Sequence, residues 1–205
     1  MYLERVLGAT RVYARAELLD DYLQRILKHH IKKLGSGFET IVFAHPTLSD
    51  VVVCICPNDS GKAAWARACM KASHNPYLPV IHQISRAALA FGAKDYTFAV
   101  IFCEKLQKAN VNVILAHYGA LFSDFRSGKP GRYLQDHLEN YDDAVREAFN
   151  LVASGYPKFR IDLHENNYMM RQGAWVVIND PWLNWRNRDR SLDSLEVHYE
   201  SIPGS

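Results

Sequence analysis

Three side chains that carry oxygen ligand atoms, Asp162, Asn167 and Asp180, lie close together in the sequence. Carboxylate and amide oxygens suit Mg²⁺, which also binds phosphate oxygens and water. A further carboxylate beside such ligands can accept the proton of an attacking hydroxyl group, as phosphoryl transfer requires. Each residue alone would be explained by a turn, with Asp180 placed directly before Pro181. All three at these offsets favour a phosphoryl-transfer site.

A β-hairpin would bring these three side chains together. Apolar runs at residues 168–170 and 175–178 flank Gln172-Gly173, and such runs around a turn signal predict two short strands. Two of the polar residues then lie in the loop that enters the first strand, and the third lies where the second strand ends. Both ends of a hairpin lie on the same side, so we expect the three side chains to converge.

The segment from Asp162 to Asn167, Asp-Leu-His-Glu-Asn-Asn, resembles the catalytic loop of the protein-kinase superfamily, Asp-Leu-x-x-x-Asn. Asp180-Pro181-Trp182 stands where that family has Asp-Phe-Gly, at the spacing that the family uses. Asp-Leu-His-x-x-Asn-x-Met-Met, followed by Val-Ile-x-Asp-Pro, is more similar still to one group, the early host-shutoff serine/threonine protein kinases of short-tailed T-odd coliphages. The usual His-Arg before the catalytic Asp is absent, and Arg160-Ile161 stands there.

This resemblance implies an α+β fold: a minimal two-lobed kinase-like domain with an antiparallel-sheet N-lobe and a reduced helical C-lobe. The single domain would cover residues 1–205, with an extra helical extension at 1–33, the N-lobe at 34–106 and the C-lobe at 107–205. The resemblance also implies ATP and Mg²⁺. Asp162 would be the catalytic residue, and Asn167 and Asp180 would be the metal ligands.

The same resemblance assigns nucleotide-binding residues to the N-terminal half. Gly35-Ser36-Gly37 precedes a β-rich run and resembles the glycine-rich loop, where backbone can approach phosphates closely. Thr40 stands at the third glycine of that pattern. The hinge that binds adenine would follow Cys103 as gatekeeper. The nucleotide-binding set is Gly35, Ser36, Gly37, Val42, Cys54, Glu104 and Leu106.

Cys54 is the largest departure from the family pattern, because it stands where the family has the lysine that holds the α- and β-phosphates. Losing one fixed electrostatic donor costs about 3–4 kcal/mol, or roughly 10²–10³ in rate. The helix expected at 60–73 offers no Glu to pair with such a lysine, since residues 60–79 contain no acidic side chain. Three explanations are open. The Lys–Glu ion pair is missing from this branch, or another lysine binds the phosphates, with Lys62 and Lys71 as candidates. The third is that Cys54 is an inactivating substitution.

Periodicity and turn residues predict the elements that position these residues. Strands are expected at 38–44, 50–56, 80–91 and 96–103. Helices are expected at 14–33, 60–73, 110–122, 133–154 and 191–199, with a loop at 123–132 and a helix stop at Gly155-Tyr156-Pro157.

The composition is that of an ordinary globular protein: 205 residues, 48% hydrophobic, 22% charged and a net charge of +2. A nearly neutral chain gives no reason to expect direct nucleic-acid binding. Four cysteines without zinc spacing indicate reduced thiols in a cytosolic compartment. No apolar run approaches the ~18 residues of a membrane span, so we expect a soluble protein without membrane contact. The sequence carries no signal for oligomeric state.

Three hypotheses follow. The first is a phage-type serine/threonine protein kinase that transfers the γ-phosphate of ATP to host proteins in the host cytoplasm. The second, suggested by Cys54, is a pseudokinase that binds and inhibits a host protein. The third, suggested by Asp-Leu-His, is a small-molecule kinase of the aminoglycoside type. That class needs an extended C-lobe, and the 25 residues after Asp180 leave too little room for one.

Overall fold

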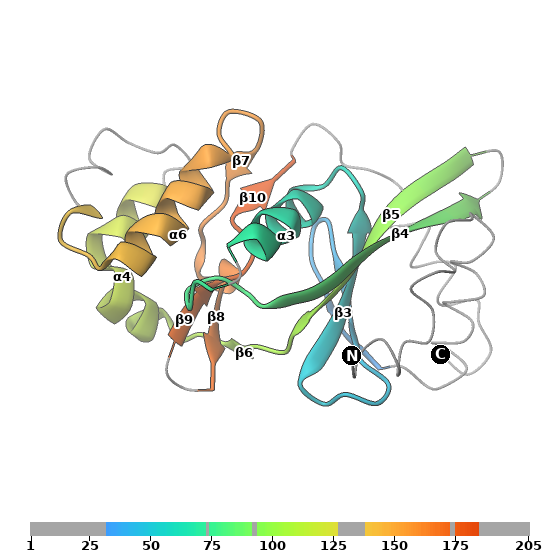
Figure 1. Ribbon diagram of the computed structural model, residues 1–205, viewed down its shortest axis with the longest axis horizontal. Coiled ribbons are helices and arrows are strands. Elements are labelled where there is room, and N and C mark those ends of the chain that lie inside the picture. The colour runs from blue at the N-terminus through green and yellow to red at the C-terminus, as the bar shows by residue number, and fades with distance from the viewer. Residues whose placement is uncertain (1–31, 73, 92–93, 127–137, 173–174, 185–205) are drawn as a thin grey trace. The chain divides into compact units, whose positions relative to one another are not determined.

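The chain is α+β within the residues that the computed structural model describes, with antiparallel β-sheets and three helices (Figure 1). The described residues are 32–72, 74–91, 94–126, 138–172 and 175–184. They form two compact units, one made of residues 32–58 and 83–102 and the other of residues 59–82 and 103–184. In this division the segment 59–82 groups with the C-terminal half.

The first unit is a five-stranded sheet in the order β1-β2-β3-β5-β4. Its strands are β1 Lys33–Ser36, β2 Ile41–Ala44, β3 Val51–Pro57, β4 Ile81–Phe91 and β5 Lys94–Glu104. The pairs β1–β2 and β2–β3 are antiparallel. Because β3 is rich in valine and isoleucine and lies inside the sheet, it is buried along its whole length. The four predicted strands are confirmed, whereas β1 was expected only as a loop.

The turn between β2 and β3 is built around the buried side chain of His45. Its Nδ1 atom accepts hydrogen bonds from the backbone N–H groups of Thr47 at 3.3 Å and Leu48 at 3.1 Å. An imidazole that accepts through Nδ1 is neutral and carries its proton on Nε2. Burial lowers the pKa of His45, while the charge of Asp50 acts in the opposite direction. The turn is therefore built for the neutral ring.

Acid should weaken this turn. Since folding lowers the pKa of His45, the unfolded chain binds more protons below the ordinary histidine pKa of about 6.5. We expect the free energy of unfolding to decrease as the pH falls from about 7 through that range. In His45→Asn the free energy of unfolding should fall less over the same pH range, because an Asn side chain accepts the same hydrogen bonds without titrating. Urea unfolding of both proteins at about pH 7.5 and about pH 5.5 measures this, and equal changes in both would contradict it.

Within its described residues, the second unit has the helices α3, α4 and α6 and two small sheets in the orders β6-β8-β9 and β10-β7. The helices are α3 Gly61–Lys71, α4 Val111–Arg126 and α6 Asp143–Ser154. The strands are β6 Gln107–Lys108, β7 Arg160–Ile161, β8 Tyr168–Arg171, β9 Trp175–Ile178 and β10 Trp182–Leu183, and the short 3₁₀ helix η1 covers Glu165–Asn167. The predicted hairpin is confirmed as β8–β9, whose turn residue Gln172 has a φ of 42°.

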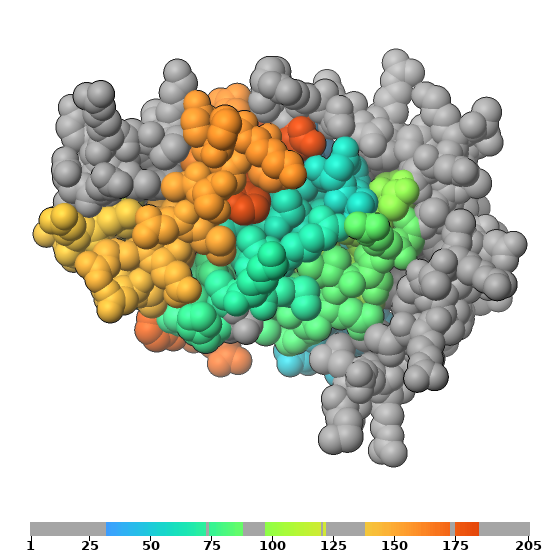
Figure 2. Space-filling view, turned by 45° about the horizontal axis from the view of Figure 1, so that its top comes forward, coloured from blue at the N-terminus to red at the C-terminus, as the bar shows by residue number. Residues whose placement is uncertain are grey.

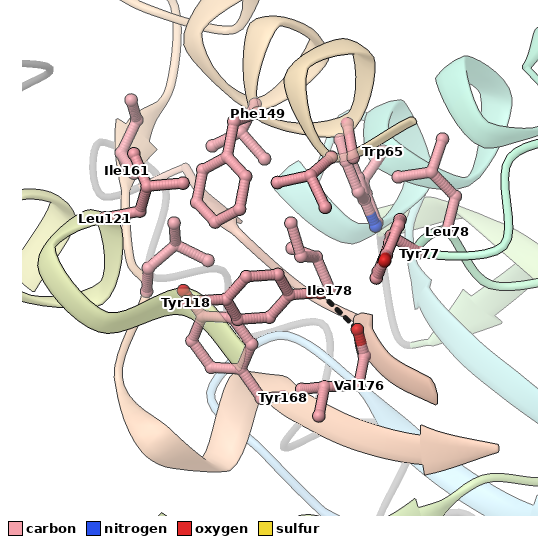
Figure 3. Packing of buried hydrophobic residues seen from close by; sticks show 14 of the residues in the cluster. Trp65, Tyr77, Leu78, Tyr118, Leu121, Phe149, Ile161, Tyr168, Val176 and Ile178 are labelled. Carbon is pink, nitrogen blue, oxygen red and sulfur yellow. Dashed lines mark hydrogen bonds between the residues drawn. The ribbon is translucent and has the colours of Figure 1, made fainter. Parts of the chain in front are cut away.

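A single hydrophobic core holds the second unit together (Figure 3). Tyr118 of α4 lies at its centre, where its ring meets Phe149 of α6 edge-on at 5.2 Å and its hydroxyl donates to the carbonyl of Val176 in β9. The other side chains labelled in the view are Trp65, Tyr77, Leu78, Leu121, Ile161, Tyr168 and Ile178. The hairpin that carries the candidate site thus contacts α4 and shares one core with residues of α3 and α6.

The prediction of one long helix at 133–154 is wrong. α6 begins only at Asp143, and the preceding residue Asp142 is its N-cap, whose side chain accepts the N–H of Val145 at 2.8 Å. A carboxylate that bonds an exposed N–H favours the start of a helix over its interior, so the helix begins here. The predicted end of the helix is confirmed, with Gly155 at the C-cap.

The predicted end of α4 is also wrong. The helix continues past residue 122 to Arg126, so the first part of the loop predicted at 123–132 is helical. It is kinked at Gly119, whose φ of 42° is not helical. The remainder of that loop, the helix predicted at 191–199 and residues 14–31 of the helix predicted at 14–33 lie outside the described residues. The predicted end of that first helix is wrong, because Lys33 is the first residue of β1. Among the described helices, none is both long enough and apolar enough to cross a membrane.

Candidate functional site

The hairpin brings the segments of Asp162, Asn167 and Asp180 together, as the sequence predicted. Asp162 directly follows β7, and its N–H donates to the carbonyl of Pro181 at 2.8 Å. The N–H of Asn179 donates to the carbonyl of Asn167, also at 2.8 Å. These two bonds join the loop before β8 to the segment after β9, and so fix the three residues in one place.

The side chain of Asn167 is held in one orientation. Its Nδ2 atom donates to the carbonyl oxygen of Asp162 at 2.5 Å. In a planar amide the oxygen then points away from that carbonyl. The amide oxygen of Asn167 is then the side-chain atom that can bind a metal ion or accept a hydrogen bond.

His164 contacts the carboxylate of Asp162. The Nδ1 atom of His164 accepts the N–H of Asn166 at 3.2 Å, so the proton of the neutral ring lies on Nε2. That Nε2 atom lies 3.5 Å from Oδ2 of Asp162, and both side chains are partly exposed. His164 therefore lies beside the Asp162 carboxylate and leaves it accessible.

Asp180 is a partly buried residue with one buried oxygen atom, Oδ1, that has no hydrogen-bond partner among the described residues. Burial raises the pKa of its carboxyl group, the charge of Lys62 opposes this, and the charge of Asp162 adds to it. An unpaired buried carboxylate oxygen is costly, and a cation bound to it would remove that cost.

Asn167 and Asp180 fit the donor set that Mg²⁺ requires. One amide oxygen and one carboxylate oxygen are hard ligands, and Mg²⁺ usually takes its other ligands from phosphate and water. Among the described residues, no group of three or more His, Cys, Asp and Glu side chains is placed to hold a metal ion. A pair of ligands is smaller than such a group, so Mg²⁺ here would need further oxygen ligands from outside the protein.

Lys62, one of the two lysines suggested as a replacement cation, lies at this site. Its side chain is 3% exposed, and Nζ donates to the carbonyl oxygen of Asn179 at 2.9 Å and to its Oδ1 atom at 3.3 Å. The other candidate, Lys71, is exposed at the end of α3. The first turn of α3 can lie close to the segment after Asp180 because the residue before Lys62 is Gly61. A Cβ at Gly61 would lie 1.9 Å from the carbonyl oxygen of Trp182.

Trp182 anchors the segment that follows Asp180. Its Nε1–H donates to the carbonyl of Val152 at 2.8 Å, its ring stacks on Phe159 at 5.4 Å, and Trp65 meets it edge-on at 5.0 Å. A Cβ at Gly155 would lie 2.3 Å from the indole. Figure 2 shows α3 and α6 next to each other, with only small areas of the red segment around β10 visible between them.

In the first unit, three of the predicted nucleotide-binding residues share one cross-strand row. Val42 of β2 pairs with Gly35 of β1 on one side and with Cys54 of β3 on the other. The fold does not itself require the two glycines. A Cβ at Gly35 would meet nothing within 4 Å, and one at Gly37 would meet only the carbonyl of Thr40 at 4.0 Å.

The expected hinge residue Glu104 is firmly held in the second unit. Its N–H donates to the carbonyl of Val80 at 3.0 Å, and Oε1 accepts the N–H of Val80 at 2.8 Å. Its carboxylate also pairs with Arg171, which further bonds carbonyl groups in the loop at 76–78. Leu106 lies two residues on and is half-buried. These contacts fix the backbone at the position to which the resemblance assigns adenine.

Sequence reasoning missed Asn179 and the anchoring role of Trp182. Asn179 links the site through its backbone, which bonds Asn167, and through its side chain, which accepts from Lys62. A polar residue directly between a buried strand and Asp180 was the signal that could have identified it. The role of Trp182 depends on packing against distant glycines, for which the local sequence has no signal.

No model of a known protein family matches the chain, and a search of curated proteins finds no match either. The assignment of a function therefore depends on the geometry of the residues described above.

Proposed function

We propose that the chain is an ATP- and Mg²⁺-dependent serine/threonine protein kinase with a minimal two-lobed kinase-like fold. One observation carries the proposal: backbone hydrogen bonds of Asp162 and Asn167 to the two neighbours of Asp180 join the three segments, the Asn167 amide nitrogen donates to the Asp162 carbonyl, and one buried carboxylate oxygen of Asp180 has no partner among the described residues.

In the proposed reaction, Asp162 accepts the proton of the acceptor hydroxyl group as that group attacks the γ-phosphate of ATP. His164 holds the Asp162 carboxylate in position from 3.5 Å. Asn167 and Asp180 would hold Mg²⁺, which when bound offsets the negative charge of the phosphates. Placement of the reactants and compensation of charge supply most of the rate in this class of reaction.

The substrate class follows from the resemblance. The motif from Asp162 to Met170 and the Val-Ile-x-Asp-Pro run resemble early phage kinases, so we propose host proteins as substrates and the host cytoplasm as the place of action. Serine and threonine hydroxyl groups are the expected acceptors.

The test is to incubate the purified chain with γ-labelled ATP and Mg²⁺, alone and with a bacterial lysate. We expect label on serine and threonine of the chain or of lysate proteins, and loss of that label when a chelator removes Mg²⁺. Label that appeared only on an added aminoglycoside would favour a small-molecule kinase. Absence of label under all conditions would contradict the proposal.

A second candidate function is favoured by Cys54, which cannot supply the expected phosphate-binding cation. In that case the chain would be a pseudokinase that binds a host protein and inhibits it by occupancy. It would retain its effect on host cells when phosphate transfer is abolished, and a kinase would not.

The glycine segment provides a prediction that separates ligand binding from folding. Gly35→Ala should leave the free energy of unfolding nearly unchanged, because the added Cβ meets nothing within 4 Å. If backbone near Gly35 approaches the nucleotide phosphates, the same methyl group should weaken ATP binding several-fold. Equilibrium titration with a fluorescent ATP analogue measures this, and Leu34→Ala, at an exposed neighbouring position, is the matched control. Equal affinities in the native chain and Gly35→Ala would remove this segment from the site.

A further inference from the structure

Arg171, the last residue of β8, joins three segments of the second unit through its guanidinium group. Its Nε and Nη2 atoms donate to the two carboxylate oxygens of Glu104. Its Nη1 atom donates to the carbonyl of Pro76 at 2.7 Å, and Nη2 donates to the carbonyl of Leu78 at 2.8 Å. The side chains of Arg171 and Glu104 are 22% and 15% exposed. Because the planar fork of an arginine matches a carboxylate bidentately, this pair has a fixed geometry.

The segment 104–107 is held against β8 at both of its ends. At Glu104 the contact is the ion pair with Arg171, and at Gln107 it is the antiparallel pairing of β6 with Met170. Met170 and Arg171 are neighbours in β8, so two adjacent residues of one strand hold both ends of the segment. The backbone of the two residues between them is therefore restrained as well.

β8 connects this segment to the proposed metal site. Asn167 directly precedes β8 and Arg171 ends it, so an extended chain places the two residues about 13 Å apart. A nucleotide whose phosphates share a metal ion with Asn167 and whose base meets the segment 104–107 would lie along this strand. Arg171 is at the base end of that path, and Asn167 is at the phosphate end.

We propose that Arg171 is the positioning residue for recognition of adenine, because it holds the backbone of the segment 104–107 in place. The inference rests on the proposed function. Adenine presents an amino donor and ring-nitrogen acceptors, which backbone C=O and N–H groups complement only when they are held in place. The base takes no part in the reaction, so its contacts are equally strong in the ground state and the transition state. Arg171 should therefore affect the KM for ATP and not kcat.

The first test compares ATP with ITP, whose base has a carbonyl oxygen where adenine has the amino group. Both nucleotides are titrated in the presence of Mg²⁺, and the ratio of their affinities cancels the fraction of folded protein. We expect the native chain to prefer ATP, and we expect this preference to fall by roughly 5–10-fold in Arg171→Met, as for the loss of about one hydrogen bond. An unchanged preference in Arg171→Met would overturn the assignment, and so would equal binding of ATP and ITP by the native chain.

Arg146→Met is the matched control. Arg146 also forms an ion pair, with Asp143 of the same helix α6, and both side chains are exposed. This variant loses an arginine and an ion pair as Arg171→Met does, but it should keep the native preference for ATP. A fall in preference as large as that in Arg171→Met would show that the effect is not specific to the segment 104–107, and would overturn the assignment.

A double variant keeps the test valid if Arg171→Met folds poorly, because that variant leaves the sheltered Glu104 carboxylate without its partner. Arg171→Met combined with Glu104→Met removes both charges and leaves no carboxylate unpaired. If the two side chains act as a unit, the double variant should show the same loss of preference for ATP as Arg171→Met. The native preference in the double variant would show that the ion pair does not position the segment.

Kinetics with γ-labelled ATP give a readout that a purely structural role would not change. In Arg171→Met the KM for ATP should rise by roughly 5–10-fold, while kcat per folded molecule stays near the native value. A lower kcat with an unchanged KM would contradict the assignment, because Arg171 would then act on the reacting groups or on the fold as a whole.

The outcomes also separate this inference from the proposed function. If the native chain transfers phosphate from ATP, but Arg171→Met and the double variant keep the native preference, only the assignment of Arg171 fails. If the native chain neither binds ATP with Mg²⁺ nor transfers phosphate, the proposed kinase function fails, and the assignment of Arg171 fails with it.

Discussion

Asp162→Asn should lower phosphate transfer by about 10²–10⁴ and leave the fold and ATP affinity unchanged. An Asn side chain has the same size as Asp but cannot accept a proton from the attacking hydroxyl group. The backbone contacts of Asp162, to Pro181 and to the Asn167 amide, are retained in this variant. Initial rates with γ-labelled ATP, together with equilibrium binding of a fluorescent ATP analogue, measure the two effects separately.

Glu165→Gln is the matched control for this variant. Glu165 lies in the same loop, in the short helix η1, and its side chain is exposed. Glu165→Gln removes the same negative charge from the loop but no group of the proposed reaction, so its transfer rate should stay close to that of the native chain. Transfer at the native rate in Asp162→Asn would show that Asp162 is not the base. An effect on host cells that persists in this variant without transfer would favour the pseudokinase.

The local sequence was sufficient to predict the hairpin that carries the site. Apolar strand residues on both sides of Gln172 specify β8 and β9, and antiparallel pairing then places both outer ends together. Since Asn167 precedes β8 and Asp180 follows β9, their proximity required no knowledge of the rest of the fold. The buried strand β3 was predictable for the same reason, because its residue types favour a sheet interior.

The part of the site that depends on long-range packing could not be predicted. Lys62 and Asn179 are 117 residues apart, and the sequence suggested Lys62 only as one of two possible cations. Their contact depends on Gly61, which in the sequence indicates no more than the start of a helix. The break before α6 was missed because a capping Asp142 within an otherwise helical pattern is a weak signal against many favourable residues. The nucleotide-binding roles predicted for Gly35, Val42, Glu104 and the rest of that set stay predictions.

Trp182→Ala should reduce the free energy of unfolding by about 3–5 kcal/mol, the usual cost of removing a buried Trp side chain. The indole stacks on Phe159, contacts Trp65 edge-on and donates to the carbonyl of Val152. Trp182→Phe keeps a ring in that place but leaves the carbonyl without its donor, so we expect a smaller loss of about 1–3 kcal/mol. Urea unfolding measures both variants.

Trp175→Ala is the control for removal of a Trp side chain, because Trp175 is 41% exposed. It should cost about 1 kcal/mol or less, since substitutions on the surface have small effects. Equal losses in Trp182→Ala and Trp175→Ala would show that the indole of Trp182 does not anchor the second unit.

The effect of Trp182 should extend from stability to phosphate transfer. Trp182 pairs with Ile161 in the two-stranded sheet, and the carbonyl of Pro181 accepts the N–H of Asp162, so the indole fixes backbone on both sides of the site. Displacement of a reacting group by about 1 Å can cost 10²-fold in rate. Transfer per folded molecule should therefore fall in Trp182→Ala and stay near the native rate in Trp182→Phe, because a ring of either kind keeps Asp180 in place. If both variants keep the native rate per folded molecule, Trp182 stabilises the fold without positioning Asp180.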